Sequence, residues 1–169
     1  GFGFFLLRIS MFHHNPHRAN TEPLDMVVDA ETLKHWLADY DTDNIVIGVV
    51  ASHSSLQILH GARMEGFKTL GIAVGENRRR FYKAFPGAEP DEWLMLENYR
   101  EMLDHAEWFR ERNVVIIPHG SLVEYLGSSN FRALEVPTFG NRGILHWESS
   151  RARQREWLES GGCTMPRVL

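Results

Sequence analysis

Two short apolar runs rich in β-branched residues, residues 45–50 (IVIGVV) and 114–118 (VVIIP), most constrain the fold of this chain. Such runs are too short for a buried helix and are typical of strands that are covered on both faces. Segments with apolar residues at helical spacing separate the expected strands. Because this alternation favours parallel pairing through right-handed crossovers, we expect an α/β fold. Its predicted form is a Rossmann-like three-layer sandwich with a mostly parallel sheet of four or five strands.

The same periodicity places the other elements. Further strands are predicted over residues 68–74 (KTLGIAV), 92–96 (EWLML) and, in shorter form, 134–137 (LEVP). Helices are predicted over residues 30–40, 54–65, 98–113, 121–127 and 144–162. Residues 76–90 are basic and contain prolines, which favours an irregular segment with residues 78–80 as a solvated arginine cluster.

Composition argues against several functional classes. Lys and Arg number 18 against 22 Asp and Glu, a net charge of −4 without a basic stripe, so no nucleic-acid partner is expected. The apolar start, GFGFFLLRIS, is shorter than the roughly 20 residues that span a membrane, so no membrane partner is expected. The single cysteine, Cys163, cannot form an internal disulfide, which favours a cytoplasmic protein. No base accompanies this thiol in GGCTMP, and we expect it to be inert rather than nucleophilic.

Three regions follow from these patterns. Residues 1–29 are expected to be a peripheral leader, and the sequence leaves its order or disorder open. Residues 30–143 form the predicted Rossmann-like domain, and residues 144–169 form a helix that leads away from it. His13, His14 and His17 in the leader would need helical spacing to chelate a metal, and Pro16 interrupts that spacing. No metal site is therefore predicted.

Polar segments follow three of the expected strands. They are SHSS at residues 52–55, HGS at residues 119–121 and FGNR at residues 139–142. Ligands of open α/β sheets bind outside the carboxyl ends of the strands, near the point where the strand order reverses. The first two segments place an imidazole beside a hydroxyl at a helix start, where free backbone N–H groups favour an anion. The candidate ligand contacts are His53, Ser54, Gly120, Ser121, Asn141 and Arg142.

A structural role for the serines is the alternative. Taken singly, Ser54 and Ser121 are typical helix caps. Capping leaves His53 unexplained, because an apolar residue would serve a purely structural strand end better. The chain lacks a Gly-x-Gly-x-x-Gly segment after the first strand, a P-loop and a Gly-x-Ser-x-Gly elbow, which argues against dinucleotide binding, P-loop ATP binding and serine hydrolysis. We therefore expect a pocket for another polar ligand at the strand ends.

Three segments, ASHSSLQILHGARMEGFKTL, VVIIPHGSLVEYLG and VPTFGNRGILHWES, resemble a known family in order and spacing. They are similar to the amino-terminal domain of the archaeal PurP family, the formate-dependent 5-formaminoimidazole-4-carboxamide ribonucleotide (FAICAR) synthetases. The resemblance covers residues 44–166 and implies a pre-ATP-grasp domain that an ATP-grasp domain follows. The chain departs from the family pattern at Gly143, His146 and Ser150, where the family has a basic residue, an arginine and an acidic residue.

The resemblance implies a carbon–nitrogen ligase of purine (IMP) biosynthesis that uses ATP to join formate to 5-aminoimidazole-4-carboxamide ribonucleotide (AICAR). His53 and Ser121 are then expected to hold AICAR, and His53 is the candidate catalytic base, with a purely hydrogen-bonding role left open. ATP and Mg²⁺ would belong to the ATP-grasp domain, in cis or on a separate chain, and not to the residues present here. The chain alone is therefore expected to be inactive, and the full enzyme to be a homo-oligomer.

Other functions remain open at this point. A non-catalytic module that binds a phosphorylated metabolite needs the same pocket, and the motifs do not separate it from the ligase. A flavodoxin-like redox domain is a weaker alternative, because no segment marks a flavin site. The sequence also leaves open whether the chain is a fragment or a natural short protein.

Overall fold

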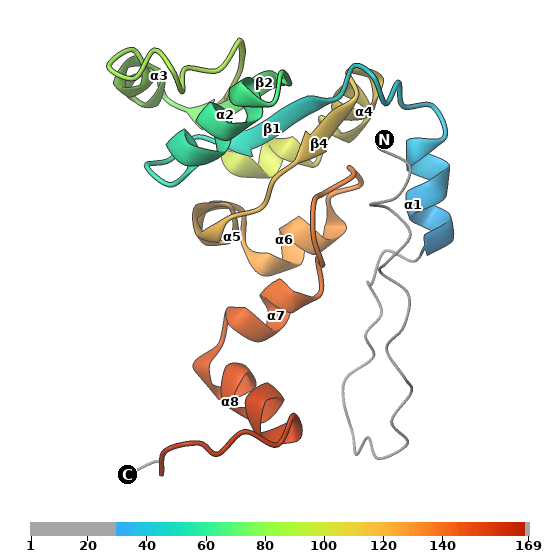
Figure 1. Cartoon of the computed structure of the whole chain (residues 1–169), viewed down its shortest axis with the longest axis vertical. Helices are drawn as coiled ribbons and strands as arrows, with labels where there is room; N and C mark the ends of the chain where they lie inside the picture. The colour runs from blue at the N-terminus through green and yellow to red at the C-terminus, as the bar shows by residue number, and fades with distance from the viewer. Residues whose placement is uncertain (1–29, 168–169) are drawn as a thin grey trace.

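The apolar runs of the sequence form one sheet. The computed structural model describes residues 30–167, in which four strands pair in the order β3-β2-β1-β4 (Figure 1). The strands are β1 (Val46–Val50), β2 (Lys68–Val74), β3 (Glu92–Leu96) and β4 (Val114–Ile116). All three pairings are parallel. The predicted α/β class and four of the five predicted strands are confirmed.

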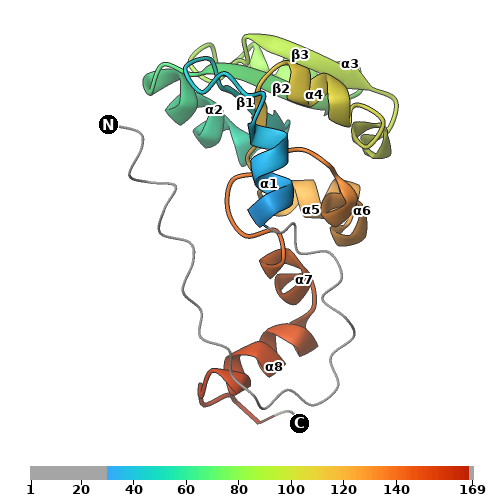
Figure 2. The same ribbon diagram turned by 90° about the vertical axis from the view of Figure 1, so that its right-hand side faces the viewer.

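Helices cover both faces of the sheet, because alternate strand residues point to opposite faces. On one face, α2 (Ser55–Met64) and α3 (Glu76–Tyr82) pack over Val49 and Ala73. The other face packs Val50 and Ile72 against η2 (Tyr99–Met102), α4 (Ala106–Glu111), α5 (Gly120–Leu126) and α6 (Ser128–Ala133). The predicted three layers are thus present, as the rotated view in Figure 2 also shows.

The chain reverses its direction across the sheet after β3. From β1 it steps outward through β2 to β3, and it then returns past both strands to place β4 on the free side of β1. Right-handed crossovers require the returning helices to lie on the opposite face, where η2 and α4 are found. The switch point of the fold therefore lies between β1 and β4.

The segment predicted to be irregular contains a helix. Residues 76–82 form α3, which begins after Gly75, whose φ of 79° ends β2. Tyr82 anchors this helix, because its side chain is fully buried and packs edge-on against Trp93. In the sequence, the three consecutive arginines at residues 78–80 made this segment look solvated and concealed the buried contact of Tyr82.

The predicted helix over residues 98–113 is divided into η2 and α4. Three donors converge on the carbonyl of Glu101, namely the backbone N–H of Asp104 and of His105 and the imidazole Nδ1 of His105. The backbone pattern changes there from three-residue to four-residue spacing, so the helix is interrupted.

Two further predictions for the second half of the chain are wrong. The strand expected over residues 134–137 is reduced to one bridge between Ile116 and Thr138, because Pro137 has no N–H to donate. The tail helix is two helices, α7 (Ile144–Glu148) and α8 (Arg151–Ser160), because Ser150 is extended and its side chain caps the N–H of Arg153. Helix α6 was not anticipated.

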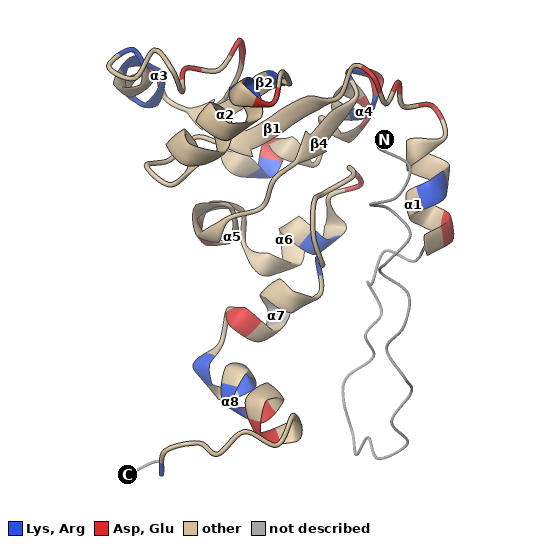
Figure 3. Ribbon diagram, viewed as in Figure 1, with Lys and Arg blue, Asp and Glu red and all other residues tan. Residues whose placement is uncertain are grey.

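The ends of the described chain lie away from the sheet core. Helix α1 (Ala30–Leu37) is followed by Tyr40, whose buried hydroxyl donates to the carbonyl of Val114 at 2.8 Å. Helices α7 and α8 extend beyond α6, and α8 carries basic residues in its first half and acidic residues in its second half (Figure 3). Within residues 30–167, none of the helices is long and apolar enough to cross a membrane. The predicted leader, residues 1–29, lies outside the described residues.

The side chains of Pro90 and Trp93 pack so closely on Gly71 that a larger residue at this position should destabilise the protein. A Cβ at this position of β2 would lie 2.6 Å from Pro90 Cγ and 2.8 Å from Trp93 Cζ3. We expect Gly71→Ala to lower the free energy of unfolding by about 1–3 kcal/mol in urea denaturation, because neither ring can move freely. Gly61→Ala is the control. Position 61 is exposed on α2 with no atom within 4 Å of the added Cβ, so this change should stabilise the protein slightly. Equal effects of the two changes would contradict the prediction.

Candidate ligand-binding site

The exits of β1 and β4 meet at the switch point of the sheet. His119 follows β4, and its Nε2 lies 2.9 Å from the carbonyl oxygen of Val50, the last residue of β1. A carbonyl oxygen only accepts, so Nε2 carries the hydrogen and donates it. This bond ties the HGS segment to the end of β1, two residues before the SHSS segment. The prediction that these two exits lie side by side is confirmed.

Two of the three serines after β1 hold the turn together. Ser52 and Ser55 are both fully buried. The backbone N–H of Ser52 donates to Ser55 Oγ at 2.9 Å, and that hydroxyl donates to the carbonyl of Ser52 at 2.9 Å. The hydroxyl of Tyr82, from α3, donates to the same carbonyl at 2.7 Å and also contacts Ser55 Oγ. Burial raises the pKa of Tyr82, so its hydroxyl keeps its proton near neutral pH.

This network leaves His53 and Ser54 exposed at the tip of the turn. Ser54 occupies the N-cap position of α2, but its side chain makes no capping hydrogen bond. Ser121 is inside α5 and buried, and the N-cap position of that helix belongs to His119. Neither serine therefore has the capping role that was the structural alternative. A Cβ at Gly120 would meet no atom within 4 Å, so the space beside this exposed glycine is open.

His119 lies at the β4 exit and was not among the candidate ligand contacts. Its Nδ1 is buried and has no hydrogen-bond partner among residues 30–167. Burial lowers the pKa of His119, and the nearby charged form of His53 lowers it further, against the opposing hydrogen bond to Val50. The imidazole of the HGS segment was noted in the sequence, but only the glycine and the serine of that segment were named as candidate ligand contacts.

The third predicted exit lies on the outer side of β4. Thr138 bridges to Ile116 there, and residues 139–142 follow it. Asn141 is exposed, and its Oδ1 accepts the N–H of Gly143 at 2.9 Å. The sequence could not show that this segment is separated from the β1 exit by the full width of β4.

Arg142 is a buried cation that binds the chain's own backbone. Its guanidinium donates to the carbonyls of Leu134 and Val136, and more weakly to that of Phe131 at 3.4 Å. The ring of Trp36 from α1 lies 5.6 Å from the guanidinium carbon. Burial lowers the pKa of Arg142 to about 10, which still leaves it charged at neutral pH. Its direct role toward a ligand stays a prediction.

A separate cleft opens at the amino-terminal end of the strands, between α1 and α4. Four of its lining residues are acidic, namely Asp39, Glu107, Glu111 and Glu135. This charge disfavours an anionic ligand there, whereas the turn at residues 52–55 and the segment at residues 119–121 carry no carboxylate. Within residues 30–167, no three or more His, Cys, Asp or Glu side chains are grouped to hold a metal ion.

A family model described as "Protein of unknown function (DUF1246)" matches residues 47–169 of this chain. The chain belongs to this family. The matched residues include both exits of the DUF1246 switch point, with His53 on one and His119 and Ser121 on the other.

Curated relatives of this DUF1246 protein are named as synthetases. The 5-formaminoimidazole-4-carboxamide-1-(beta)-D-ribofuranosyl 5'-monophosphate synthetase 1 of Methanosarcina mazei is 52% identical over 140 residues, which are 83% of this chain and 39% of that protein. The synthetase of Archaeoglobus fulgidus is 44% identical over 133 residues, 78% of this chain and 36% of that protein. The resemblance seen in the sequence is confirmed: the chain is a homologue of the amino-terminal region of these proteins and spans about two fifths of their length.

Among solved structures, the crystal structure of the phosphoribosylaminoimidazole carboxylase ATPase subunit from Aquifex aeolicus matches with a TM-score of 0.44 and 15% identity. The match covers 73% of this chain and 35% of that one. The fold assignment of the DUF1246 domain rests on the strand order and connections described above.

Removal of the Tyr82 hydroxyl should destabilise this DUF1246 domain. In Tyr82→Phe, the buried turn at Ser52 and Ser55 loses a donor and an acceptor. We expect the free energy of unfolding to fall by about 1–2 kcal/mol in urea denaturation. The control, Tyr125→Phe, removes a hydroxyl 3.5 Å from Arg78 and should cost less than about 0.5 kcal/mol. A smaller effect at Tyr82 than at Tyr125 would show that the network does not hold the turn.

The lowered pKa of His119 predicts a pH dependence of stability. The unfolded chain takes up a proton at this residue near pH 6.5, while the folded chain does so only at lower pH. The stability that the neutral form of His119 contributes is therefore fully present above about pH 6.5. It is lost as the pH falls below that value, by at most about 1.4 kcal/mol per pH unit. His119→Gln keeps a donor toward Val50 but does not titrate. Urea denaturation between pH 7.5 and 5 should give a flatter curve for this variant, and parallel curves would refute the assignment.

Proposed function

We propose that this chain is the substrate-binding part of an ATP-dependent carbon–nitrogen ligase that joins formate to AICAR and yields FAICAR in purine biosynthesis. The observation that carries the proposal is the meeting of two His/Ser exits at the switch point of the sheet. These exits lie in the part of the chain that is about half identical to the named synthetases. The position is the one where open α/β sheets bind their ligands.

The chemistry of the exits suits this substrate. AICAR carries a phosphate, a carboxamide and an exocyclic amine, so it needs cationic or N–H donors at one end and mixed donors and acceptors at the other. Helix α2 begins at the β1 exit, where its free backbone N–H groups favour an anion. Ser121 and the exposed Ser54 each offer a hydroxyl that can donate or accept.

His53 is proposed to contact the amine that is formylated. When the new C–N bond forms, this amine must lose a proton, and a neutral imidazole can accept it near neutral pH. The same geometry allows His53 simply to accept a hydrogen bond from the amine and orient it. His53 is free for either role because the turn below it is held by Ser52, Ser55 and Tyr82 rather than by its own side chain.

The remaining parts of the reaction are assigned outside these residues. ATP and Mg²⁺ would be bound by an ATP-grasp region, which corresponds to the length of the relatives that this chain does not cover. Formate would be phosphorylated there by ATP to formyl phosphate and ADP, and the AICAR amine at the switch point would displace the phosphate as the C–N bond forms. The complete enzyme is proposed to be a cytoplasmic homo-oligomer, with α7 and α8 leading from the Rossmann-like domain toward the ATP-grasp region.

Calorimetric titration of the chain with AICAR tests the proposal. We expect saturable binding, and His53→Ala should weaken it at least tenfold because a direct ligand contact is lost. The control is His35→Ala on α1, which removes an exposed imidazole at the opposite end of the strands and should leave the affinity unchanged. No heat at millimolar AICAR, or equal effects of the two variants, would count against the site.

A further inference from the structure

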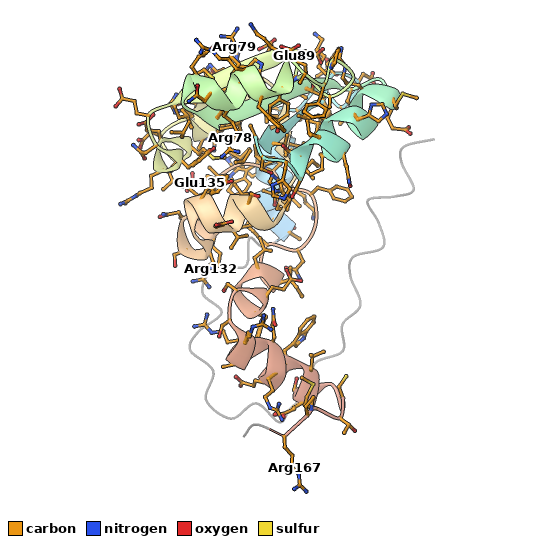
Figure 4. All side chains as sticks on the ribbon, turned by 90° about the vertical axis from the view of Figure 1, so that its left-hand side faces the viewer. Arg78, Arg79, Glu89, Arg132, Glu135 and Arg167 are labelled. Atoms are coloured by element: carbon orange, nitrogen blue, oxygen red, sulfur yellow. The ribbon has the colours of Figure 1, made fainter. Side chains whose placement is uncertain are left out.

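Arg78 is the one member of the arginine cluster at residues 78–80 that points into the protein. It lies in the first turn of α3, directly after the carboxyl end of β2. Tyr82 follows four residues later, so the two side chains share a helix face. Because Tyr82 reaches the turn at Ser52, this face looks onto the β1 exit. Figure 4 shows Arg78 on the side of α3 toward α5, and Arg79 on the opposite, outer side.

The Arg78 side chain reaches across to the helix that follows β4. One of its terminal nitrogens lies 3.5 Å from the hydroxyl of Tyr125 on α5, and its guanidinium carbon lies 5.8 Å from the centre of that ring. Tyr125 in turn stacks on Tyr99, with ring centres 5.1 Å apart and planes at 17°. Arg78 therefore spans from the end of β2 to α5. Two aromatic rings hold the position of its charge.

No carboxylate neutralises this charge within the part of the chain that the structure describes. Arg79, the next residue, pairs with Glu76 at 3.8 Å, whereas Arg78 has no acidic partner within 4.0 Å among residues 30–167. Burial raises the pKa of Tyr99, and the charge of Arg78 partly offsets that rise, as expected for a cation close to the ring hydroxyl. A half-buried guanidinium that contacts aromatic rings but no carboxylate keeps its planar donors available for an anion.

We propose that Arg78 binds the phosphate group of the ligand, and so makes the site select a phosphorylated nucleotide over the nucleoside. This inference rests on the proposed function for the part of the ligand other than its phosphate, whereas the phosphate is inferred from Arg78 itself. The phosphate would lie between α3 and α5, next to the exits that carry His53 and His119. The guanidinium fork can donate two parallel hydrogen bonds to phosphate oxygens, which an ammonium group cannot.

The test compares three ligands by calorimetry or by NMR shift titration of the full chain: AICAR, the unphosphorylated AICA riboside, and ribose 5-phosphate. Arg78→Gln should weaken binding of AICAR and of ribose 5-phosphate roughly 10- to 100-fold. It should leave binding of the riboside unchanged within about threefold, because that ligand lacks the anion. The matched control is Arg80→Gln, which removes the same charge from an exposed position of the same helix and should affect none of the ligands.

A second substitution at position 78 tests the geometry of the contact, and thermal unfolding checks for loss of the fold. Arg78→Lys keeps the charge and loses the fork, so it should retain AICAR binding better than Arg78→Gln and worse than the unmodified chain. Thermal unfolding of all three variants checks that the fold is intact. Equal loss of affinity for the nucleotide and the riboside in Arg78→Gln would overturn the phosphate assignment, as would identical behaviour of Arg78→Gln and Arg80→Gln.

The outcomes separate this inference from the proposed function. Suppose that ribose 5-phosphate binds in an Arg78-dependent way and that AICAR binds no more tightly than it does. This result would support the phosphate role of Arg78 and refute the AICAR site. Binding of AICAR that does not depend on Arg78 would support the site and refute Arg78. An unmodified chain that binds none of the phosphorylated ligands would refute both.

Discussion

The parallel pairing of β1 with strands on both of its sides determines where this protein can bind a ligand. Since crossovers are right-handed, the return from β3 to β4 puts η2 and α4 on the face opposite α2 and α3. The connections after β1 and β4 then diverge to opposite faces of the sheet, as at the switch points where open α/β sheets bind ligands. The hydrogen bond from His119 to Val50 holds the two strand exits together at the point of divergence.

The polar turn after β1 places buried side chains that hold the turn next to exposed side chains within four residues. Ser52 and Ser55 form the hydrogen bonds that close the turn, and the Tyr82 hydroxyl links the turn to α3 by a further hydrogen bond. His53 is thereby displayed on a rigid support, which is what a residue that must orient a substrate requires. The acidic cleft at the other end of the strands provides an electrostatic contrast, because it repels the kind of ligand that Arg78 and the start of α2 attract.

Sequence patterns predicted the sheet and the adjacency of the His/Ser exits because both depend on local features. The runs at residues 45–50 and 68–74 are apolar at every position or nearly so, and parallel pairing follows from the helices between them. The patterns failed where one long-range contact decides the structure. Burial of Tyr82 anchors a helix in an arginine-rich segment. Hydrogen bonds to the Glu101 carbonyl interrupt a segment whose apolar spacing is regular for a helix. For the same reason Arg78 was assigned to solvent, since only its contact with Tyr125, 47 residues away, turns it inward.

Helix α8 has a consequence for how the chain unfolds. None of its ten residues is buried, and the contacts that hold it include the Ser150 cap, an Arg155–Glu159 ion pair at 2.8 Å and a hydrogen bond from Gln154 to the carbonyl of Glu148. Helices of this length are marginal without tertiary packing, so α8 opens at a small fraction of the free energy that the sheet requires. We therefore expect the chain to unfold in two steps, in which the sheet and the exits of β1 and β4 stay protected from hydrogen exchange while α8 exchanges freely.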